Sequence, residues 1–88
     1  MSSISLAFSS SPVRALADLP VGAHGYVVEV RATEGRADRL LALGVTPGAR
    51  VSVLQTFPGV VFLCDQTELA VERAVADTIV IRLLESRS

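Results

Sequence analysis

The sequence predicts a mainly β domain: a small, closed or nearly closed barrel of about five short strands, with one short helix inserted after the first long strand. Three observations support this. Apolar residues alternate or run together only in short segments, turn-forming residues separate these segments, and a single stretch has helical spacing. The chain of 88 residues leaves room for one core.

The folded domain is expected to occupy residues 13–84. Residues 1–12 are rich in serine and end at Pro12, which is typical of a flexible tail. Residues 85–88 are expected to form a C-terminal tail.

The first long strand is expected at residues 26–31, after a turn marked by Gly22. Successive side chains of a strand point to opposite sides of a sheet. The alternation therefore predicts that Tyr26, Val28 and Val30 share one face.

The helix is expected between this strand and the next. Ala37, Leu40 and Leu41 recur at helical spacing, which predicts a single buried stripe on an otherwise polar helix.

A tight turn is expected to end the helix. Gly44 stands where a left-handed residue commonly follows a helix, and Pro47 prevents continuation. Pro47 and Gly48 fit the two central positions of a type II turn, in which Gly48 takes a positive φ. We therefore assign structural turn roles to Gly22, Gly44, Pro47 and Gly48.

The remaining segments complete the barrel. Strands are expected at residues 51–57, 60–65, 69–71 and 78–84, with a single helical turn at 74–77. The segment 60–65 starts with an unbroken apolar run, which predicts a strand covered on both faces.

Four short segments along the chain carry a resemblance to a known family. They are Leu19-Pro20-Val21-Gly22, Arg39-Leu40-Leu41-Ala42-Leu43-Gly44-Val45-Thr46-Pro47-Gly48, Leu69-Ala70-Val71 and Ile79-Val80-Ile81. In this order they resemble the FeoA family, the small ferrous iron transport protein A of bacteria. The resemblance extends over residues 13–84.

The resemblance implies an SH3-like barrel, a topology that patterning alone does not separate from an OB-like one. It implies a cytoplasmic, non-enzymatic accessory protein of bacterial ferrous iron uptake. Such a protein docks to the cytoplasmic part of the FeoB-type membrane transporter, which carries a GTP-hydrolysing domain, and modulates its assembly or activity. The alternative is a regulatory SH3-like domain that acts on another protein, such as an iron-dependent repressor.

Composition narrows the classes of partner. The net charge of −1 gives no basic stripe for nucleic acid. No apolar run approaches the ~20 residues needed to cross a bilayer, so we expect no membrane insertion. The N-terminus lacks the features of a signal peptide, which agrees with a cytoplasmic location. A groove for proline-rich peptides would need more aromatic residues than the chain has.

Catalysis is not expected. A nucleophile needs a base beside it, but the chain has one histidine, His24, and one cysteine, Cys64, which lies in an apolar strand and is expected to be a buried core residue. Asp65 and Glu68 flank a turn, where carboxylates are common for local reasons.

His24 is a weak candidate ligand for a metal shared between two molecules. It is expected to be a solvent-exposed turn residue. Zinc sites use three or four protein ligands, which speaks against a site in one molecule and against a metallochaperone. We expect folding to need no metal, and weak binding of Fe²⁺ or Zn²⁺ only between two molecules of a weak homodimer.

The candidate partner-binding surface is the exposed face of the helix with the turn that follows it. Two arginines three residues apart lie on neighbouring turns of one face, with Glu34 and Asp38 as expected local ion-pair partners. Apolar residues of the turn would supply an anchor inside this charged rim. The candidate residues are Arg36, Arg39, Leu43, Val45 and Pro47.

The chain departs from the family pattern after the Leu-Ala segment. Family members often carry an arginine there, whereas this chain has Glu72 followed by Arg73. A surface around these two residues, on the opposite side of the barrel from the helix, is the second candidate for partner binding. The segment between Phe57 and Val60 is also shorter than the corresponding loop of the family.

Overall fold

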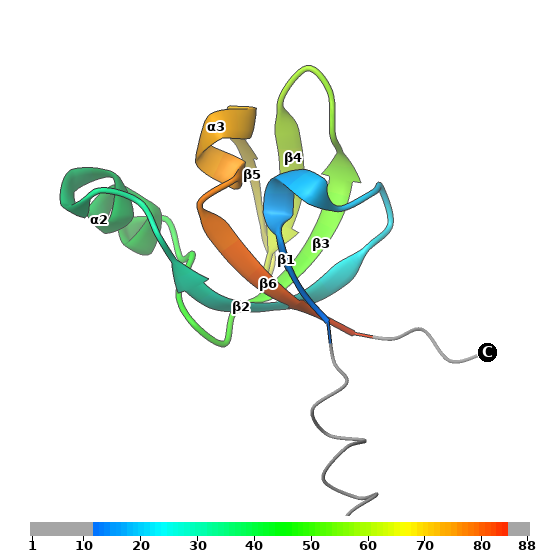
Figure 1. Cartoon of the computed structure of the whole chain (residues 1–88), viewed down its shortest axis with the longest axis horizontal. Coiled ribbons are helices and arrows are strands. Elements are labelled where there is room, and N and C mark those ends of the chain that lie inside the picture. The colour runs from blue at the N-terminus through cyan, green and yellow to red at the C-terminus, as the bar shows by residue number, and fades with distance from the viewer. Residues whose placement is uncertain (1–11, 85–88) are drawn as a thin grey trace, which may run out of the picture.

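A single antiparallel sheet of six strands forms the body of the molecule, seen in a computed structural model that describes residues 12–84. The sheet curls around its core, and α2 projects to one side (Figure 1). In chain order the elements are β1 (Val13–Ala15), the 3₁₀ turn η1 (Leu16–Asp18), β2 (His24–Val30), α2 (Glu34–Ala42), β3 (Arg50–Gln55), β4 (Val60–Cys64), β5 (Thr67–Val71), α3 (Arg73–Ala76) and β6 (Ile79–Leu83).

The mainly β class and the helix inserted after the first long strand are confirmed. The strand order is β1-β6-β2-β3-β4-β5, so β1 and β5 form the two edges of the sheet. The structure has one strand more than the five or so expected, namely β1, which pairs with β6. Just before β1, the Pro12 carbonyl accepts a hydrogen bond from the Leu83 amide at 2.9 Å. Of the tails expected at 1–12 and 85–88, only Pro12 lies among the described residues.

The core is aliphatic, with one aromatic residue at its centre. Phe62 on β4 is fully buried, as are Val51 on β3 and Ile79 and Ile81 on β6. Leu16 of η1 closes the core from the β1 side. The strands β2 to β6 therefore contribute their inward faces to one shared cluster, as expected of a small barrel.

The predicted face assignment of β2 is wrong in its first half. Val27 is buried, whereas Val28 is exposed. A register shift between Val27 and Glu29 interrupts the pairing of β2 with β6. Such a bulge adds one residue to one strand, so Val27 and Val30 both contact the core although three positions separate them.

The strand β4 is buried on one face only, contrary to its unbroken apolar sequence. Val60, Phe62 and Cys64 are buried, whereas Val61 and Leu63 are half-buried on the outer face. The outer residues are only partly covered, so the run of apolar residues reflects strand propensity there rather than double burial.

Gly25 on β2 lies directly against the backbone of β6. A Cβ at this position would lie 2.1 Å from the backbone oxygen of Arg82. Only a residue without a side chain fits this contact, and the sequence alone carries no sign of it.

Candidate functional site

The helix α2 stands away from the sheet (Figure 1), and one of its side chains is buried. Leu40 is 3% exposed and joins the core. Leu41, which the spacing assigned to the same buried stripe, is 54% exposed, so that assignment is wrong. A helix of nine residues with one buried leucine leaves nearly its whole surface accessible.

The turn after α2 fixes the helix to the barrel through its backbone. The Val45 amide donates to the Leu40 carbonyl and the Gly44 amide to the Leu41 carbonyl, both at 2.9 Å. These two bonds are those of a Schellman motif, and Gly44 takes the φ of +99° that it requires. The predicted helix end at Gly44 is confirmed.

The Pro47-Gly48 turn is also confirmed. The Ala49 amide donates to the Thr46 carbonyl at 2.9 Å across the turn, and Gly48 has a φ of +94°. The Gly48 amide donates to the Val27 carbonyl at 2.8 Å, which ties the turn to β2. Gly22 likewise has a positive φ, so its predicted turn role holds.

A groove separates α2 from the edge strand β5 and the start of α3. We call it the α2–β5 groove; its volume is about 290 Å³. Leu40 and Leu43 on one wall and Val71 and Val75 on the other make it largely apolar. The full set of lining residues is Arg36, Arg39, Leu40, Leu43, Ala70, Val71, Glu72 and Val75.

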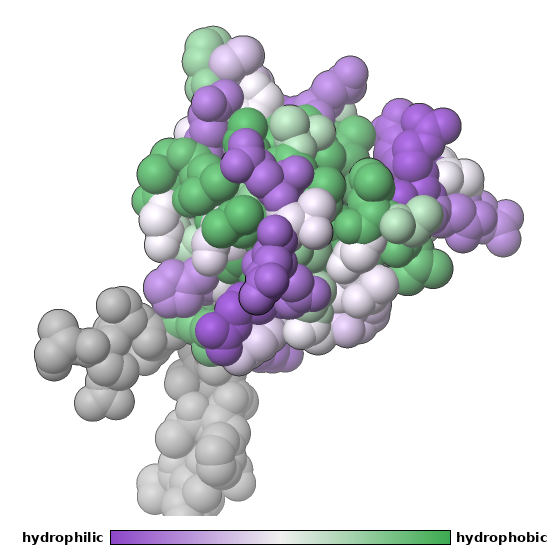
Figure 2. Space-filling view, turned by 180° about the vertical axis from the view of Figure 1, so that it is seen from behind, coloured by the Kyte–Doolittle hydropathy of each residue, from purple (hydrophilic) through white to green (hydrophobic). Residues whose placement is uncertain are grey.

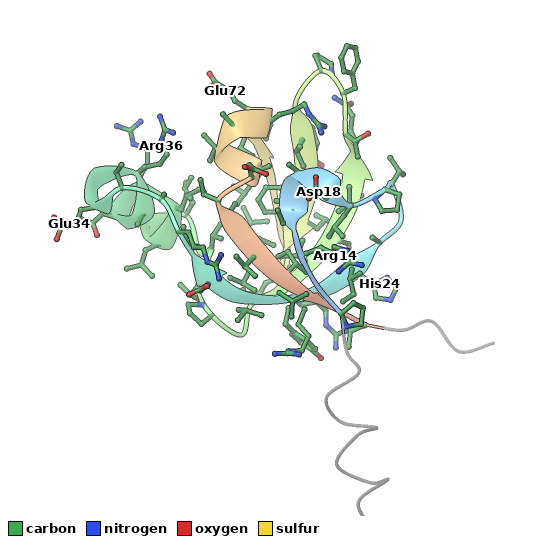
Figure 3. The ribbon with its side chains drawn as sticks, in the orientation of Figure 1. Arg14, Asp18, His24, Glu34, Arg36 and Glu72 are labelled. Atoms are coloured by element: carbon green, nitrogen blue, oxygen red, sulfur yellow. The ribbon has the colours of Figure 1, made fainter. Side chains whose placement is uncertain are left out.

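Charges of both signs line this groove. Arg36 and Arg39 come from α2, and Glu72 comes from the turn between β5 and α3, as Figure 3 shows for Arg36 and Glu72. Within residues 12–84, neither arginine makes an ion pair, so the local pairing expected with Asp38 and Glu34 is wrong. The charges of the groove are therefore available to a partner.

Charged and polar residues also gather over α2 when the molecule is seen from behind (Figure 2). Apolar and polar residues are mixed over the rest of that face.

The predicted partner-binding residues do not form one surface. Arg36, Arg39 and Leu43, which is 47% exposed, line the α2–β5 groove. Pro47 lines a second hollow of about 260 Å³ on the other flank of α2, together with Leu41. Val45 lies at the base of this second hollow but is only 1% exposed, so it supports the turn more than it offers surface to a partner.

Glu72 and Arg73 do not form the separate surface expected on the opposite side of the barrel. Glu72 faces α2 across the α2–β5 groove. Arg73 turns away from it, because its guanidinium donates to the carbonyls of Thr56 at 2.7 Å and Ala17 at 3.0 Å. Arg73 therefore joins α3, the β3–β4 loop and η1, a structural role.

Cys64 is a core residue, as predicted. Its thiol is buried and lies 3.4 Å from the Gly44 carbonyl. Burial raises the pKa of this thiol, and the neighbouring negative charge of Asp65 raises it further. A buried, protonated thiol is a poor nucleophile and a poor metal ligand.

His24 begins β2 and is half-buried, so it is not the fully exposed turn residue that was expected. Its Nδ1 lies 3.3 Å from the Gly22 carbonyl. Within residues 12–84, no three His, Cys, Asp or Glu side chains group in a way that could hold a metal ion. Weak metal binding between two molecules stays a prediction.

Comparison with known proteins shows the family to which this chain belongs. The FeoA domain model matches residues 14–83. The chain belongs to the FeoA family. No curated protein sequence matches it significantly. Among the described residues, no helix has the length and apolar character needed to span a bilayer.

Solved structures of FeoA proteins share the fold of this FeoA-family chain. An iron uptake regulatory protein (FeoA) is 25% identical, with a TM-score of 0.77 over 83% of this chain and 100% of that one. FeoA from Chlorobium tepidum is 27% identical, with a TM-score of 0.77 over 84% and 73% of the two chains.

A zinc complex of FeoA from Stenotrophomonas maltophilia, a prokaryotic SH3 domain protein, is 23% identical, with a TM-score of 0.68 over 75% of this chain and 86% of that one. The predicted SH3-like fold is thereby confirmed. Membership of the family supports a role in ferrous iron transport.

Sequence reasoning missed three residues of the groove: Ala70, Val71 and Val75. Nothing in their local sequence indicates a site, since they are ordinary strand and helix residues. They line the groove only because the chain returns β5 and α3 to the side of α2.

Proposed function

We propose that this chain is a non-enzymatic, cytoplasmic accessory protein of ferrous iron uptake, which docks to the cytoplasmic part of a FeoB-type transporter and modulates its assembly or activity. The α2–β5 groove is the docking surface. The observation that supports this proposal is the pair Arg36 and Arg39, which stand without an ion pair among the described residues beside an apolar groove. Apolar anchors within a polar rim are the usual composition of a protein interface.

The charges of the groove indicate what kind of partner surface would bind it. Two arginines and one glutamate line the groove, so the groove has an excess of positive charge although the whole chain has a net charge of −1. A partner surface with acidic residues is therefore favoured, and unlike charges speed the encounter most at low ionic strength.

The test is charge reversal of both arginines, measured against the purified cytoplasmic domain of the transporter from the same organism. Arg36→Glu with Arg39→Glu should slow association by tenfold or more at low salt, with a smaller effect at high salt. The fold should persist, because exposed substitutions rarely change stability by more than about 0.5 kcal/mol. Ferrous iron uptake by cells lacking the native protein should not be restored by this variant.

A matched control separates the site from net charge. Arg14→Glu with Arg31→Glu makes the same change in total charge at exposed positions away from the groove. It also breaks the ion pair of Arg31 with Glu29, but exposed ion pairs contribute little to stability. The control should bind the transporter domain nearly as wild type does. Equal losses in both variants, or normal binding by the Arg36 and Arg39 variant, would remove the groove as the docking surface. Binding to an iron-dependent repressor in place of the transporter would favour the regulatory alternative.

A further inference from the structure

The wall of the α2–β5 groove opposite the helix is a free sheet edge. The strand β5 ends the strand order and pairs only with β4. A two-residue turn, whose first residue Asp65 has a φ of +57°, connects β4 to β5. The pairing of the residues that flank this turn therefore determines which backbone groups of β5 point outward.

Cys64 and Thr67 flank the turn and face each other in the register. Because a tight β-turn is closed by a hydrogen bond between its first and fourth residues, this pair is a hydrogen-bonded one. Antiparallel pairs alternate between hydrogen-bonded and non-bonded types. Leu69 and Val71 therefore bond to β4, whereas the amide and carbonyl groups of Glu68 and Ala70 point away from the sheet.

This edge carries few of the features that protect edge strands. Proteins blunt such edges with proline, a bulge, charged residues or a covering segment. The register of β5 with β4 is unbroken over five pairs, β5 contains no proline, and Glu68 is its only charged residue. Within the described residues, α2 does not cover the edge but faces it across the groove.

We infer that the partner segment binds as an added strand on β5, with its backbone paired to Glu68 and Ala70 and an acidic side chain turned toward Arg36 and Arg39. This inference rests on the proposed docking function and specifies the partner: an extended, acidic segment of the transporter's cytoplasmic part. The backbone bonds provide affinity and the groove provides selectivity for side chains, as in other complexes formed by strand addition.

The dimensions of the groove favour a strand over a helix. An added strand lies about 4.7–4.9 Å from its neighbour, whereas a helix with its side chains is about 10–12 Å across. A groove of about 290 Å³ accepts part of an extended segment between β5 and α2. The apolar side chains of Leu43 and Val75 then contact alternate residues of that segment.

A proline at Ala70 tests the inference directly. Ala70→Pro removes an amide that points outward, so the β4–β5 ladder keeps its own bonds, as edge strands allow. We expect the variant to fold and to bind the transporter's cytoplasmic domain at least tenfold more weakly, because the added strand loses a backbone partner. Ala70→Thr keeps the amide while enlarging the side chain, so any loss of affinity that it shows measures the side-chain contact with the groove alone. Ala70→Pro should bind at least tenfold more weakly than Ala70→Thr.

Amide hydrogen exchange gives a second readout that needs no variant. In the free protein the Ala70 and Glu68 amides should exchange quickly, and those of Leu69 and Val71 slowly. In the complex the Ala70 amide should become protected. This measurement decides the question if Ala70→Pro does not fold.

The outcomes separate this inference from the proposed function. Strand addition is overturned if Ala70→Pro folds and binds like wild type, or if the Ala70 amide stays unprotected in the complex. It is also overturned if protection arises through pairing with a second copy of the chain, seen as a dimer without the transporter domain. In each case the docking proposal survives if charge reversal of Arg36 and Arg39 still weakens binding, and it fails if that reversal has no effect.

Discussion

The sheet and the helix α2 are held in place by different kinds of interaction. In the sheet, fully buried side chains such as Val51, Phe62 and Ile79 meet in one core. In α2, one side chain, Leu40, is buried, and the Schellman bonds at Gly44 and the turn at Gly48 position the helix through its backbone. Packing thus stabilises the barrel, while backbone geometry orients the helix.

This difference explains why the candidate site is on the helix. Side chains that the core does not need are left to face outward, with Arg36 and Arg39 on one flank and Leu41 on the other. Because the helix is held by its C-terminal end and by a single leucine, its other side chains can face a partner while the core stays buried.

The largest expected effect comes from adding one methyl group to the sheet. Gly25→Ala would place a Cβ against the Arg82 carbonyl of β6, which cannot move without breaking the ladder. We expect a loss of about 3 kcal/mol or more in the free energy of unfolding, measured in urea. In α2, Gly35 has nothing within 4 Å of its added Cβ, so Gly35→Ala should stabilise the protein by about 0.5 kcal/mol. Effects of the same sign at both positions would contradict the contrast between the regions.

Removal of the helix anchor should have the next largest effect. Leu40→Ala deletes the one buried side chain of α2 and should cost about 2–3 kcal/mol. Amides of α2 should lose protection from hydrogen exchange more than those of β4. Leu41→Ala, at an exposed position of the same helix, should change stability by less than about 0.5 kcal/mol. Similar losses for both leucines would show that α2 packs through a wider face.

A smaller effect is expected at the turn. Gly44→Ala forces a side chain into a left-handed conformation and should destabilise the protein by about 1 kcal/mol, measured as a shift in the denaturation midpoint. Gly44→Asn should cost less, because asparagine tolerates this conformation better. An unchanged midpoint for Gly44→Ala would mean that the turn does not hold the helix.

The smallest effect concerns Cys64, where the core meets the turn. A thiol reagent should modify Cys64 slowly in the native protein and quickly in urea, because the side chain is buried. The raised pKa of the folded thiol means that the unfolded chain ionises first as pH rises, so stability falls above the ordinary thiol pKa near 9.0. The stability difference between wild type and Cys64→Ala should therefore narrow at high pH. Rapid native modification would reopen a metal-handling role for this residue.

Much of the fold could be predicted from the sequence because turns and strand patterns are local. The turn at Pro47-Gly48 was correctly placed, since proline restricts φ and glycine permits positive φ whatever surrounds them. The β2 bulge could not be predicted, because it depends on how β2 pairs with β6. One extra residue there reverses the positions of Val27 and Val28 relative to the core.

The candidate site divides in the same way. The sequence by itself determined that Arg36 and Arg39 share an exposed helical face, because the helical period places residues three apart on neighbouring turns. Only the tertiary structure decided that this face looks across a groove to Glu72 and a free edge of β5, and that Leu43 is exposed while Val45 is buried. The physical reason is distance along the chain: β5 and α3 follow α2 only after two intervening strands, and the pairing of the strands into one curled sheet brings them to the side of the helix.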